Sequence, residues 1–325
     1  MLNSRMDPLI GAVVIGRNEG ARLNACLRSL SKLVPRLVYV DSGSTDGSVE
    51  AALEIGAVVV SLDMTRPFTA ARARNAGWRH LLQLHPDTRF VQFVDGDCEV
   101  IAGWLESASA FLNGNKAYAV ACGRRRERHP EHSVYNRLCD REWNTPIGDA
   151  QACGGDALVT TEALLATNGY RDSLIAGEEP EWCVRLREAG WKIRRMDHDM
   201  TLHDAAILRF GQWWQRAKRG GFAFAAGAHL HGAAPHFHWV AETRRAVLWG
   251  ALLPAFSVLA AIAWPPAILV WPSLYGLQVL RLRARGINWE PALFLTLSKL
   301  PEARGIVQFY YERTVGRVSH IIEYK

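Results

Sequence analysis

The sequence predicts an α/β protein built on a doubly wound, mostly parallel sheet with helices on both faces, followed by an apolar helical hairpin. Two observations carry this fold class. From residue 11 onward, short β-rich runs alternate with helical stretches, a rhythm typical of parallel sheets. Near the C-terminus, residues 246–280 contain no charged residue, which is typical of helices that contact a membrane.

The first half of the chain contains the clearest alternation. The expected strands are, in order, GAVVIG, RLVYVD, AVVVSLD and RFVQFVD. The stretches between them that favour helices are ARLNACLRSLSKL, VEAALEIG and FTAARARNAGWRHLLQL. Polar loops follow the first, second and fourth strands. Because ligands bind such sheets at the carboxyl ends of the strands, these loops are the expected ligand site.

The middle of the chain interrupts the rhythm. Residues 124–150 are rich in charge and aromatic residues, and we expect an inserted loop or lid there. The regular pattern resumes with ALVTTEALLATNGY and EWCVRLREAGWKIRRM. In the second of these, Trp182, Leu186 and Ala189 share one helical face, and Gly190 is expected to end the helix.

The C-terminal third is different in character. As one helix, residues 246–280 would be about 52 Å long, too long for a single crossing of about 30 Å. Pro265 and Pro266 interrupt the segment near its middle. Arginines flank it on both sides, so the simplest topology is a hairpin with both ends cytosolic. Two alternatives remain open: a re-entrant or interfacial hairpin, and a buried helical pair in a soluble domain.

The composition excludes several classes of protein. The net charge of +6 comes from arginine far more than lysine, which favours phosphorylated or anionic partners. Nucleic acid is not expected, because no recognition helix, RNP motif or zinc finger is present. The scattered cysteines contain no CxxC pair and indicate reduced thiols in a cytosolic setting. The apolar run LIGAVVIG ends at Arg17 without a cleavage site, so it is expected to be a strand and not a signal peptide.

Asp95 and Asp97 stand at the tip of an expected buried strand, RFVQFVDGDCEV. Asp-Gly is also a common hairpin turn, but a hairpin requires a second strand to follow. Instead, apolar residues recur at helical spacing from Ile101 to Leu112. A strand that ends in two carboxylates and passes directly to a helix presents oxygen donors at the ligand edge of the sheet. Such donors suit a hard divalent cation, Mg²⁺ or Mn²⁺, which can carry a diphosphate.

At this point the chain resembles a family-2 glycosyltransferase of GT-A fold, over residues 9 to about 225. The resemblance rests on six motifs in the family's order: VVIGRNEGARL, VDSGSTDGS, ARARNAG, FVDGDCEV, GGDALVTTEALLATNGY and GEEPEWCVRLREAGWKI. It implies a GT-A domain over residues 1–225, with the loop or lid at 124–150. Residues 226–325 would form a membrane-associated helical region around the hairpin at 246–280.

The resemblance also implies which residues form the site. The positions that match the family's nucleotide-sugar contacts are Glu19, Asp41, Arg74, Asn75, Asp95, Gly154 and Gly155. Asp97 would be the principal metal ligand, with contributions from Asp95 and His203. The family's second acid after Asp41 is replaced here by Ser42, so the base of the nucleotide is left open. His203 is equally compatible with a partly buried structural histidine.

GEEPEW matches the family's Glu-Asp pair, whose second acid deprotonates the acceptor hydroxyl. The resemblance therefore makes Glu179 the candidate base, with Glu178 as the neighbouring alternative. Helix starts favour acidic residues through the helix dipole in any case, which offers a purely structural explanation for both.

The implied activity is inverting transfer of a sugar from a nucleotide-diphosphate sugar to an acceptor hydroxyl, dependent on Mn²⁺ or Mg²⁺. The apolar C-terminus favours a lipid-linked or envelope glycan acceptor at the cytoplasmic face of the membrane. Two alternatives remain: a membrane-tethered nucleotide-sugar-binding protein without turnover, and a sugar-phosphate nucleotidyltransferase. The latter would need a glycine-rich basic loop after the first strand, which GRNEGARL does not supply.

Overall fold

The computed structural model describes residue 7 and residues 9–323 and contains two compact units. The first, here called the sheet unit, contains most of the described chain up to Ala206. The second, the helical unit, contains the described residues from Ile207 onward together with Glu131–Leu138 and Ile175–Gly177.

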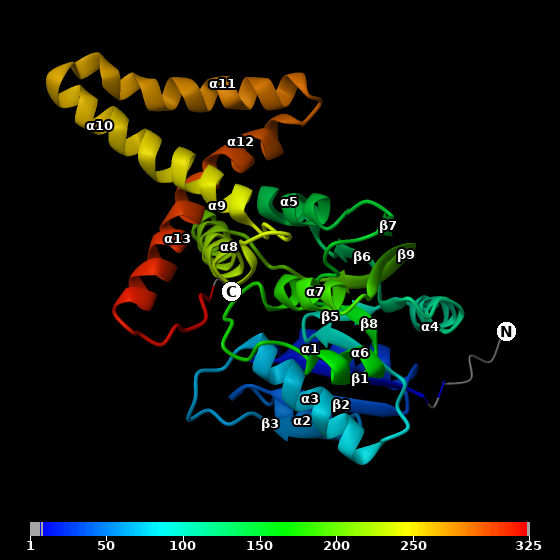
Figure 1. Ribbon diagram of the computed structural model, residues 1–325. Coiled ribbons are helices and arrows are strands. Elements are labelled where there is room, and N and C mark those ends of the chain that lie inside the picture. Colours follow the sequence, from blue (N-terminus) through cyan, green and yellow to red (C-terminus); the bar gives the residue numbers. More distant parts are fainter. Residues whose placement is uncertain (1–6, 8, 324–325) are drawn as a thin grey trace. The chain divides into compact units, whose positions relative to one another are not determined.

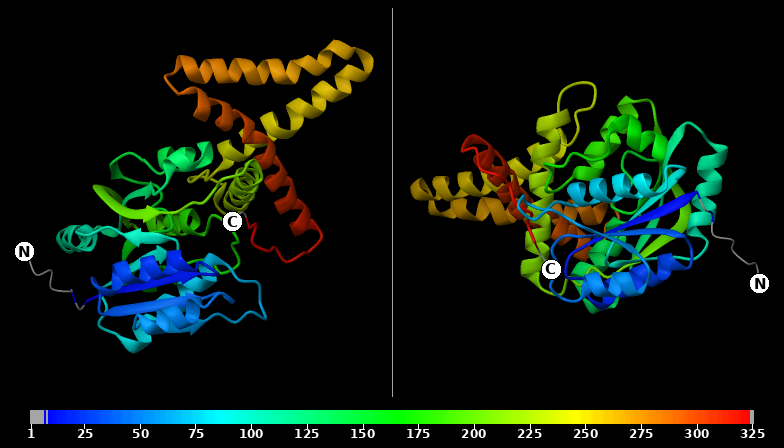
Figure 2. Two further views of the ribbon diagram at one scale, coloured as in Figure 1. Left: turned by 180° about the vertical axis from the view of Figure 1, so that it is seen from behind. Right: turned by 90° about the horizontal axis from the view of Figure 1, so that it is seen from below.

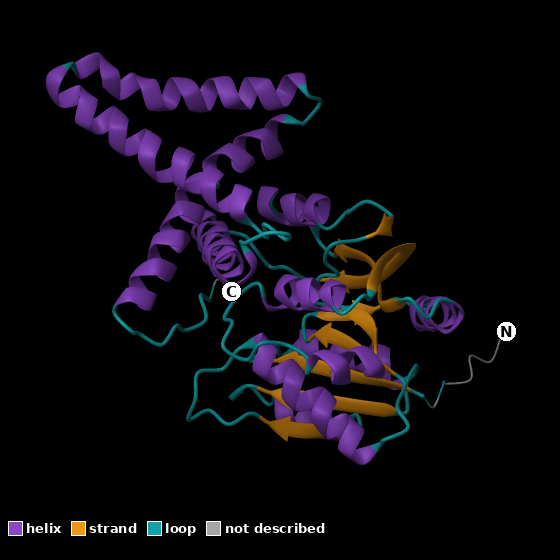
Figure 3. Ribbon diagram, viewed as in Figure 1, coloured by secondary structure: helices purple, strands orange, loops and turns teal. Residues whose placement is uncertain are grey.

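Within the described residues, the sheet unit contains one sheet of nine strands (Figure 3). The strands are β1 (Ile10–Gly16), β2 (Arg36–Asp41), β3 (Val58–Ser61), β4 (Phe90–Asp95), β5 (Cys98–Val100), β6 (Tyr118–Glu127), β7 (Gly148–Asp149), β8 (Ala157–Thr160) and β9 (Lys192–His203). Their order is β3-β2-β1-β4-β8-β6-β9-β5, with β7 paired to β9. Strands β3, β2, β1 and β4 are mutually parallel, whereas β8 is antiparallel to both β4 and β6.

Helices cover both faces of this sheet (Figure 1). One core contains side chains of α3 (Ala70–Leu84), α6 (Thr161–Thr167) and α7 (Glu178–Glu188). The other contains side chains of α1 (Ala21–Ser31), α2 (Ser48–Glu54) and α4 (Trp104–Gly114). Successive residues of β1 alternate between them, because neighbouring side chains of a strand point to opposite faces. The predicted fold class is confirmed.

The structure differs from the sequence prediction after Asp97. The chain does not pass directly to a helix, because β5 intervenes before α4 begins at Trp104. β5 pairs with β9 and not with β4, so Asp95 and Asp97 still do not form the turn of a β-hairpin. Three residues are too few to show the two-residue periodicity by which strands are recognised in a sequence.

Residues 124–150 do not form one continuous loop. β6 continues to Glu127, and a 3₁₀ turn (Pro130–His132), α5 (Val134–Glu142) and the short β7 follow. The three consecutive arginines at 124–126 gave the end of β6 the charged composition of a loop, so it was not recognised as a strand. In the fold they lie on a strand paired with β9, and Arg124 contacts Asp140 at 3.1 Å.

The helical unit contains a hairpin of apolar helices. The helices of this unit after Ile207 are α8 (Phe210–His231), α9 (Val240–Val247), α10 (Leu253–Ala263), α11 (Val270–Ala284), α12 (Trp289–Leu297) and α13 (Lys299–Thr314). The hairpin consists of α10 and α11. A π-helical turn joins α9 to α10, giving a continuous helix over Val240–Ala263. This is the single helix of the described chain that is long and apolar enough to cross a membrane. A 3₁₀ turn that begins at Pro265 then reverses the chain into α11 (Figure 2).

The hairpin exposes large apolar side chains. Phe256 is 64% exposed, Leu259 65% and Ile262 80% on α10, and Leu277 is 60% exposed on α11. Only 11% of the most apolar part of Val240–Ala263 is buried inside the protein. A contiguous apolar surface of this kind marks a contact with another apolar phase or partner.

Glycines bring α13 close to two other segments of the helical unit. A Cβ at Gly221 of α8 would collide with the backbone of Glu302, and one at Gly305 would collide with the backbone of Lys218. A Cβ at Gly250 would likewise meet the carbonyl of Lys299. Small residues at these crossings allow the backbones to approach closely, as in membrane helix pairs.

Candidate active site

The loops after β1 and β2 are joined by hydrogen bonds at the carboxyl ends of these strands. The backbone N–H of Thr45 donates to Asn18 Oδ1 at 2.7 Å, and that of Gly20 donates to Asp46 Oδ2 at 2.9 Å. Asp41 is buried, and its carboxylate accepts hydrogen bonds from the N–H groups of Gly43 and Ser44. Asp41 therefore stabilises the loop that follows β2.

Asp95 lies at the centre of a network of charged side chains. Arg74 Nη2 lies 2.7 Å from Asp95 Oδ1, and Arg125 Nη2 lies 3.2 Å from Asp95 Oδ2. Arg74 also contacts Glu178 Oε1 at 2.8 Å. Burial alone would lower the pKa of Arg74, but the carboxylates of Asp95 and Glu178 outweigh it and raise that pKa. The guanidinium stays charged, and it is held in a fixed place.

Asp156 is the most deeply buried acid of this network. Its carboxylate is fully buried and accepts hydrogen bonds from the backbone N–H of Asp95 at 2.9 Å and from the Thr201 hydroxyl at 2.8 Å. Arg125 contacts the same carboxylate at 2.9 Å. Burial acts to lower the pKa of Arg125, but Asp156 is the largest of the opposing influences that raise it.

Gly155 lies against the same charged groups. A Cβ at this position would lie 2.7 Å from Asp95 Oδ2 and 3.0 Å from a guanidinium nitrogen of each of Arg74 and Arg125. Gly154 has a φ of +82°, in the left-handed region that favours glycine. The Gly-Gly pair therefore lets the backbone pass directly beside Asp95.

Asp97 and His203 form a second, adjoining pair. His203 Nε2 lies 3.2 Å from Asp97 Oδ2, and both side chains are buried. The antiparallel pairing of β5 with β9 sets this contact, because Cys98 is the register partner of His203. The backbone N–H of Asp204 also donates to the Asp97 carbonyl at 3.1 Å. Burial lowers the pKa of His203, which favours the neutral imidazole that a metal requires.

This pair fits a hard divalent cation. Neighbouring ligands of an octahedral ion with bonds of about 2.1 Å lie about 3 Å apart, close to the observed separation of Nε2 and Oδ2. Cys98 Sγ belongs to the same group of possible ligands, but burial raises the pKa of this thiol well above its usual value. The donors that remain are an oxygen and an imidazole nitrogen, a set that Mn²⁺ accepts.

The three acids at the start of α7 have different partners. Glu178 pairs with Arg74, as described above. Glu179 Oε1 accepts hydrogen bonds from the Cys153 backbone N–H at 2.6 Å and from the Cys183 thiol at 2.9 Å. Glu181 is fully buried against Arg185, 2.9 Å away. All three carboxylates are buried, so no common role at an exposed helix end explains them.

Two predicted site residues, Glu19 and Asn75, lie outside the contacts described so far. Glu19 borders the site, because a Cβ at Gly96 would lie 3.3 Å from its Cγ. Both polar atoms of the Asn75 amide make hydrogen bonds within the protein. Its Nδ2 donates to the Tyr170 carbonyl and to Asp172, and its Oδ1 accepts from Trp78 and Tyr170. Asn75 therefore braces a loop and does not present a free amide to a ligand.

Sequence reasoning missed Arg125, Asp156 and a further buried acid, Glu127. Glu127 Oε2 lies 3.6 Å from His203 Nδ1. Two of these residues lie at the end of β6, which the sequence had predicted to be a loop. Asp156 directly follows the Gly-Gly pair, and that position was the available signal.

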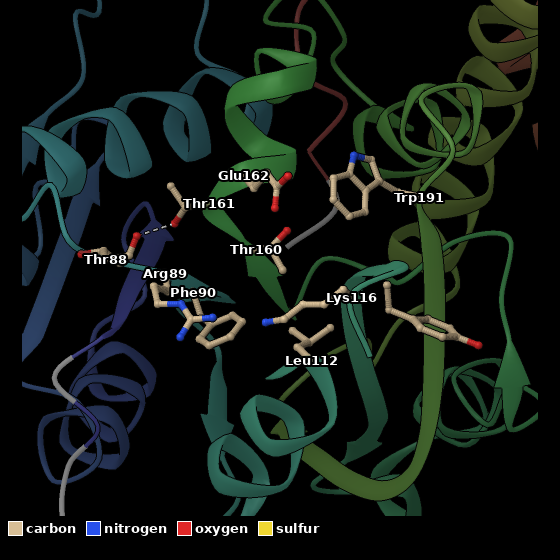
Figure 4. Close-up of a pocket in the computed structure, with 10 residues that line it drawn as sticks. Thr88, Arg89, Phe90, Leu112, Lys116, Thr160, Thr161, Glu162 and Trp191 are labelled. Atoms are coloured by element: carbon tan, nitrogen blue, oxygen red, sulfur yellow. Dashed lines mark hydrogen bonds between the residues drawn. The ribbon is translucent and has the colours of Figure 1, made fainter. Parts of the chain in front are cut away.

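A pocket of the sheet unit lies at the ends of the strands opposite to Asp95 (Figure 4). It is lined by Thr88, Arg89, Phe90, Leu112, Lys116, Tyr118, Thr160, Thr161, Glu162 and Trp191. Phe90 begins β4, whereas Asp95 ends it. The pocket is therefore separate from the charged network.

Comparison with known proteins finds similarity to glycosyltransferases. Residues 12–155 match the family described as "Glycosyl transferase family 2". The succinoglycan biosynthesis protein ExoA of Rhizobium meliloti is 25% identical over 292 residues, which cover 79% of this chain and 83% of ExoA. The glycosyltransferase AglE of Haloferax volcanii is 22% identical over 199 residues, or 57% of this chain and 64% of AglE.

One solved structure shares the fold over nearly the whole chain. The mannosyltransferase PcManGT from Pyrobaculum calidifontis, solved in complex with GDP-Man and Mn²⁺, superimposes with a TM-score of 0.63. The two proteins are 20% identical, and the alignment covers 94% of this chain and 88% of PcManGT. The matched sequence segment and the shared fold therefore make this chain similar to members of glycosyl transferase family 2.

Proposed function

We propose that this glycosyltransferase is an inverting, metal-dependent enzyme that moves a sugar from a nucleotide-diphosphate sugar to an acceptor hydroxyl. One observation carries the proposal. A buried arginine, Arg74, and a half-buried one, Arg125, contact Asp95 at the carboxyl edge of the sheet, beside the pair of Asp97 and His203. This arrangement provides positive charge for a diphosphate and ligands for a cation in adjoining places.

The donor site would lie along the loops after β1, β2 and β4. Glu19 and the Asp41 loop would contact the nucleoside, and Arg74 and Arg125 would stabilise the diphosphate. Gly154 and Gly155 would allow the donor to approach the backbone closely. The GDP-Man in the complex of PcManGT, a protein of the same fold, supports a donor of the nucleotide-sugar class.

Asp97 and His203 would hold Mn²⁺ or Mg²⁺, with Asp95 beside them. When bound, such a cation neutralises negative charge that develops on a departing diphosphate. Asp95 also has a second task, because both of its oxygens hold arginines in place. The Mn²⁺ in the PcManGT complex supports this choice of ion.

Glu179 is the proposed general base. The acceptor oxygen would attack the anomeric carbon as the bond from that carbon to the diphosphate breaks, and the hydroxyl proton would pass to Glu179. Glu178 is already held in an ion pair with the Arg74 guanidinium, which makes it less available to an acceptor hydroxyl. The two donors to Glu179 Oε1 are an amide and a thiol, both uncharged. A single displacement of this kind inverts the configuration of the sugar.

The acceptor is proposed to be a lipid-linked or envelope glycan at the cytoplasmic face of the membrane. The exposed apolar hairpin supports membrane contact, and arginines at both ends favour a cytosolic position for the sheet unit. The relative ExoA is named for succinoglycan biosynthesis, which supports a glycan product.

The function is tested by incubating the purified full chain with a library of nucleotide sugars, with and without Mn²⁺. We expect metal-dependent release of the nucleoside diphosphate from one donor class, and faster release when a lipid-linked acceptor is present. Binding without release would instead support the alternative of a nucleotide-sugar-binding protein. Release of pyrophosphate from a nucleoside triphosphate and a sugar phosphate would support the nucleotidyltransferase alternative.

We predict that the intact chain fractionates with membranes. The exposed side chains of α10 and α11 would be covered by lipid, because burial of apolar surface gains about 25 cal/mol per Å². The measurement is cell fractionation followed by extraction with carbonate and with detergent. A chain that stays soluble and monodisperse without detergent would show that the hairpin is buried by protein.

We predict that Gly155→Ala lowers kcat/KM for donor cleavage by about 10–100-fold, because a Cβ would displace Asp95 and its arginines by up to about 1 Å. Gly114→Ala is the matched control, since a Cβ at that position on α4 meets no atom within 4 Å. Equal activity of the two variants would contradict the close packing of Gly155 against the charged network.

A further inference from the structure

We infer that Glu127 is a positioning residue for His203, fixing the imidazole so that Nε2 faces Asp97, and that Trp143 supports the ring from another side. The inference deepens the proposed function and rests on it, because it concerns the same metal site. Neither residue was singled out by the sequence.

The register of the sheet places Glu127 beside His203. β6 and β9 are parallel neighbours, and Glu127 and His203 are register partners at the last position of each strand. Glu127 Oε2 therefore lies 3.6 Å from His203 Nδ1, while Nε2 on the other side of the ring lies 3.2 Å from Asp97. The side chain of Glu127 is fully buried, and that of His203 is 7% exposed.

The Glu127 carboxylate is held in this position. The backbone N–H of His129 donates to Oε1 at 3.1 Å, and that of Ala205 donates to Oε2 at 3.0 Å. The N–H of Glu127 itself donates to Asp140 at 3.0 Å. Both oxygens are therefore tied to the backbone, which leaves the carboxylate little freedom to turn away from the imidazole.

This geometry selects one form of the imidazole. A neutral histidine carries its proton on one nitrogen, and the partner of that nitrogen decides which one it is. A carboxylate only accepts hydrogen bonds, so Glu127 favours the proton on Nδ1. Nδ1 is buried and lies 3.6 Å from Glu127 Oε2, just beyond hydrogen-bond distance, and a cation at Nε2 would make the Nδ1 proton a stronger donor toward this carboxylate. The lone pair of Nε2 is then directed toward the side of Asp97.

Trp143 contacts His203 of the proposed metal site and Arg125 of the network around Asp95. Its ring centroid lies 4.7 Å from that of His203, edge to face, and the Arg125 guanidinium lies 5.6 Å from the Trp143 ring. Trp143 is half-buried and follows directly after α5. It therefore limits rotation of the imidazole on a side that Glu127 does not contact.

The test is a double-mutant cycle on Mn²⁺ affinity, read from the electron paramagnetic resonance signal of free Mn²⁺. Wild type, Glu127→Gln, His203→Ala and the double variant are compared. We expect Glu127→Gln to weaken Mn²⁺ binding by about 10–100-fold, the usual effect of losing such an outer carboxylate. If Glu127 acts through His203, it should cause no further loss in the His203→Ala background. Wild-type affinity in Glu127→Gln, or an equal loss in both backgrounds, would overturn the inference.

Trp143 provides an independent arm in case Glu127→Gln does not fold, which circular dichroism would show. Trp143→Leu should weaken Mn²⁺ binding, and Trp143→Phe, which keeps an aromatic ring, should recover most of it. Trp191→Leu is the matched control, because Trp191 is also half-buried but precedes β9, whereas His203 ends it. If Trp143→Leu binds Mn²⁺ as Trp191→Leu does, the supporting role of Trp143 is wrong.

These measurements need no turnover, and they distinguish failure of the metal site from failure of the roles of Glu127 and Trp143. If the wild type binds no Mn²⁺ even with nucleotide sugar present, the proposed metal site fails and this inference falls with it. If the wild type binds Mn²⁺ and the Glu127 and Trp143 variants bind it equally well, the metal site stands and this inference alone is wrong.

Discussion

Asp97→Asn is expected to abolish metal-dependent sugar transfer while leaving the fold intact. An amide oxygen is a neutral and weaker ligand than a carboxylate, so the cation would lose its principal anionic partner. We expect kcat to fall by about 10²–10³-fold or more, the usual loss when one stabilising group for developing negative charge is removed. Calorimetry should show loss of Mn²⁺ binding, and circular dichroism should show an unchanged fold.

A matched control for this substitution is Asp87→Asn. Asp87 forms a surface ion pair with Arg36 at 2.7 Å, and its side chain is 62% exposed. An exposed pair of this kind contributes at most about 1 kcal/mol, so activity should be unchanged. Full activity of Asp97→Asn in the presence of EDTA would show that neither Asp97 nor a metal is needed.

The first four strands could be predicted because each of them carries its own signal. The runs before Gly16, Asp41 and Asp95 are apolar, end in a polar loop and are followed by helical periodicity. These features are local, and they place the loops at one edge of a parallel sheet. The interruption of the apolar segment at Pro265 could be predicted for the same reason, since proline acts on its own turn.

The rest of the site depends on strand order, which the sequence does not display. Asp95, Arg125 and Asp156 meet because β8 lies between β4 and β6, although these residues are far apart along the chain. Likewise, Glu127 meets His203 only through the pairing of β6 with β9. The pattern of residues within a strand does not indicate which strand pairs with it. The arginines at 124–126 also gave β6 the composition of a loop.

Some partners of the three acids of α7 also depend on the tertiary fold. In the sequence, Glu178, Glu179 and Glu181 are equivalent acids at a helix start. In the fold, one pairs with Arg74, one with Cys153 and Cys183, and one with Arg185. Cys183 and Arg185 lie on α7 itself, but Arg74 comes from α3 and Cys153 from the loop before β8, and local propensity could not indicate these two contacts.

Glu179→Gln is expected to lower kcat by about 10²–10⁴-fold, the usual loss for a general base, while the Kd of the donor and of Mn²⁺ stays near that of the wild type. Glutamine keeps the size of the side chain and an oxygen that can accept from the Cys153 N–H, but it cannot take up the proton of the acceptor. Single-turnover kinetics with saturating donor and acceptor would measure the chemical step directly.

The neighbouring glutamine variants serve as controls, because each tests a different contact. Glu178→Gln removes the charge of one of the two carboxylates that contact Arg74, so it should weaken donor binding through the network around Asp95. Glu181→Gln loses a buried contact with Arg185 and should cost about 1.5–3 kcal/mol of unfolding free energy, with little change in kcat once the protein is folded. If Glu178→Gln loses kcat and Glu179→Gln does not, Glu178 is the base, and its release from Arg74 must accompany acceptor binding. If none of the three loses more than about tenfold in kcat, no acid of α7 takes the proton.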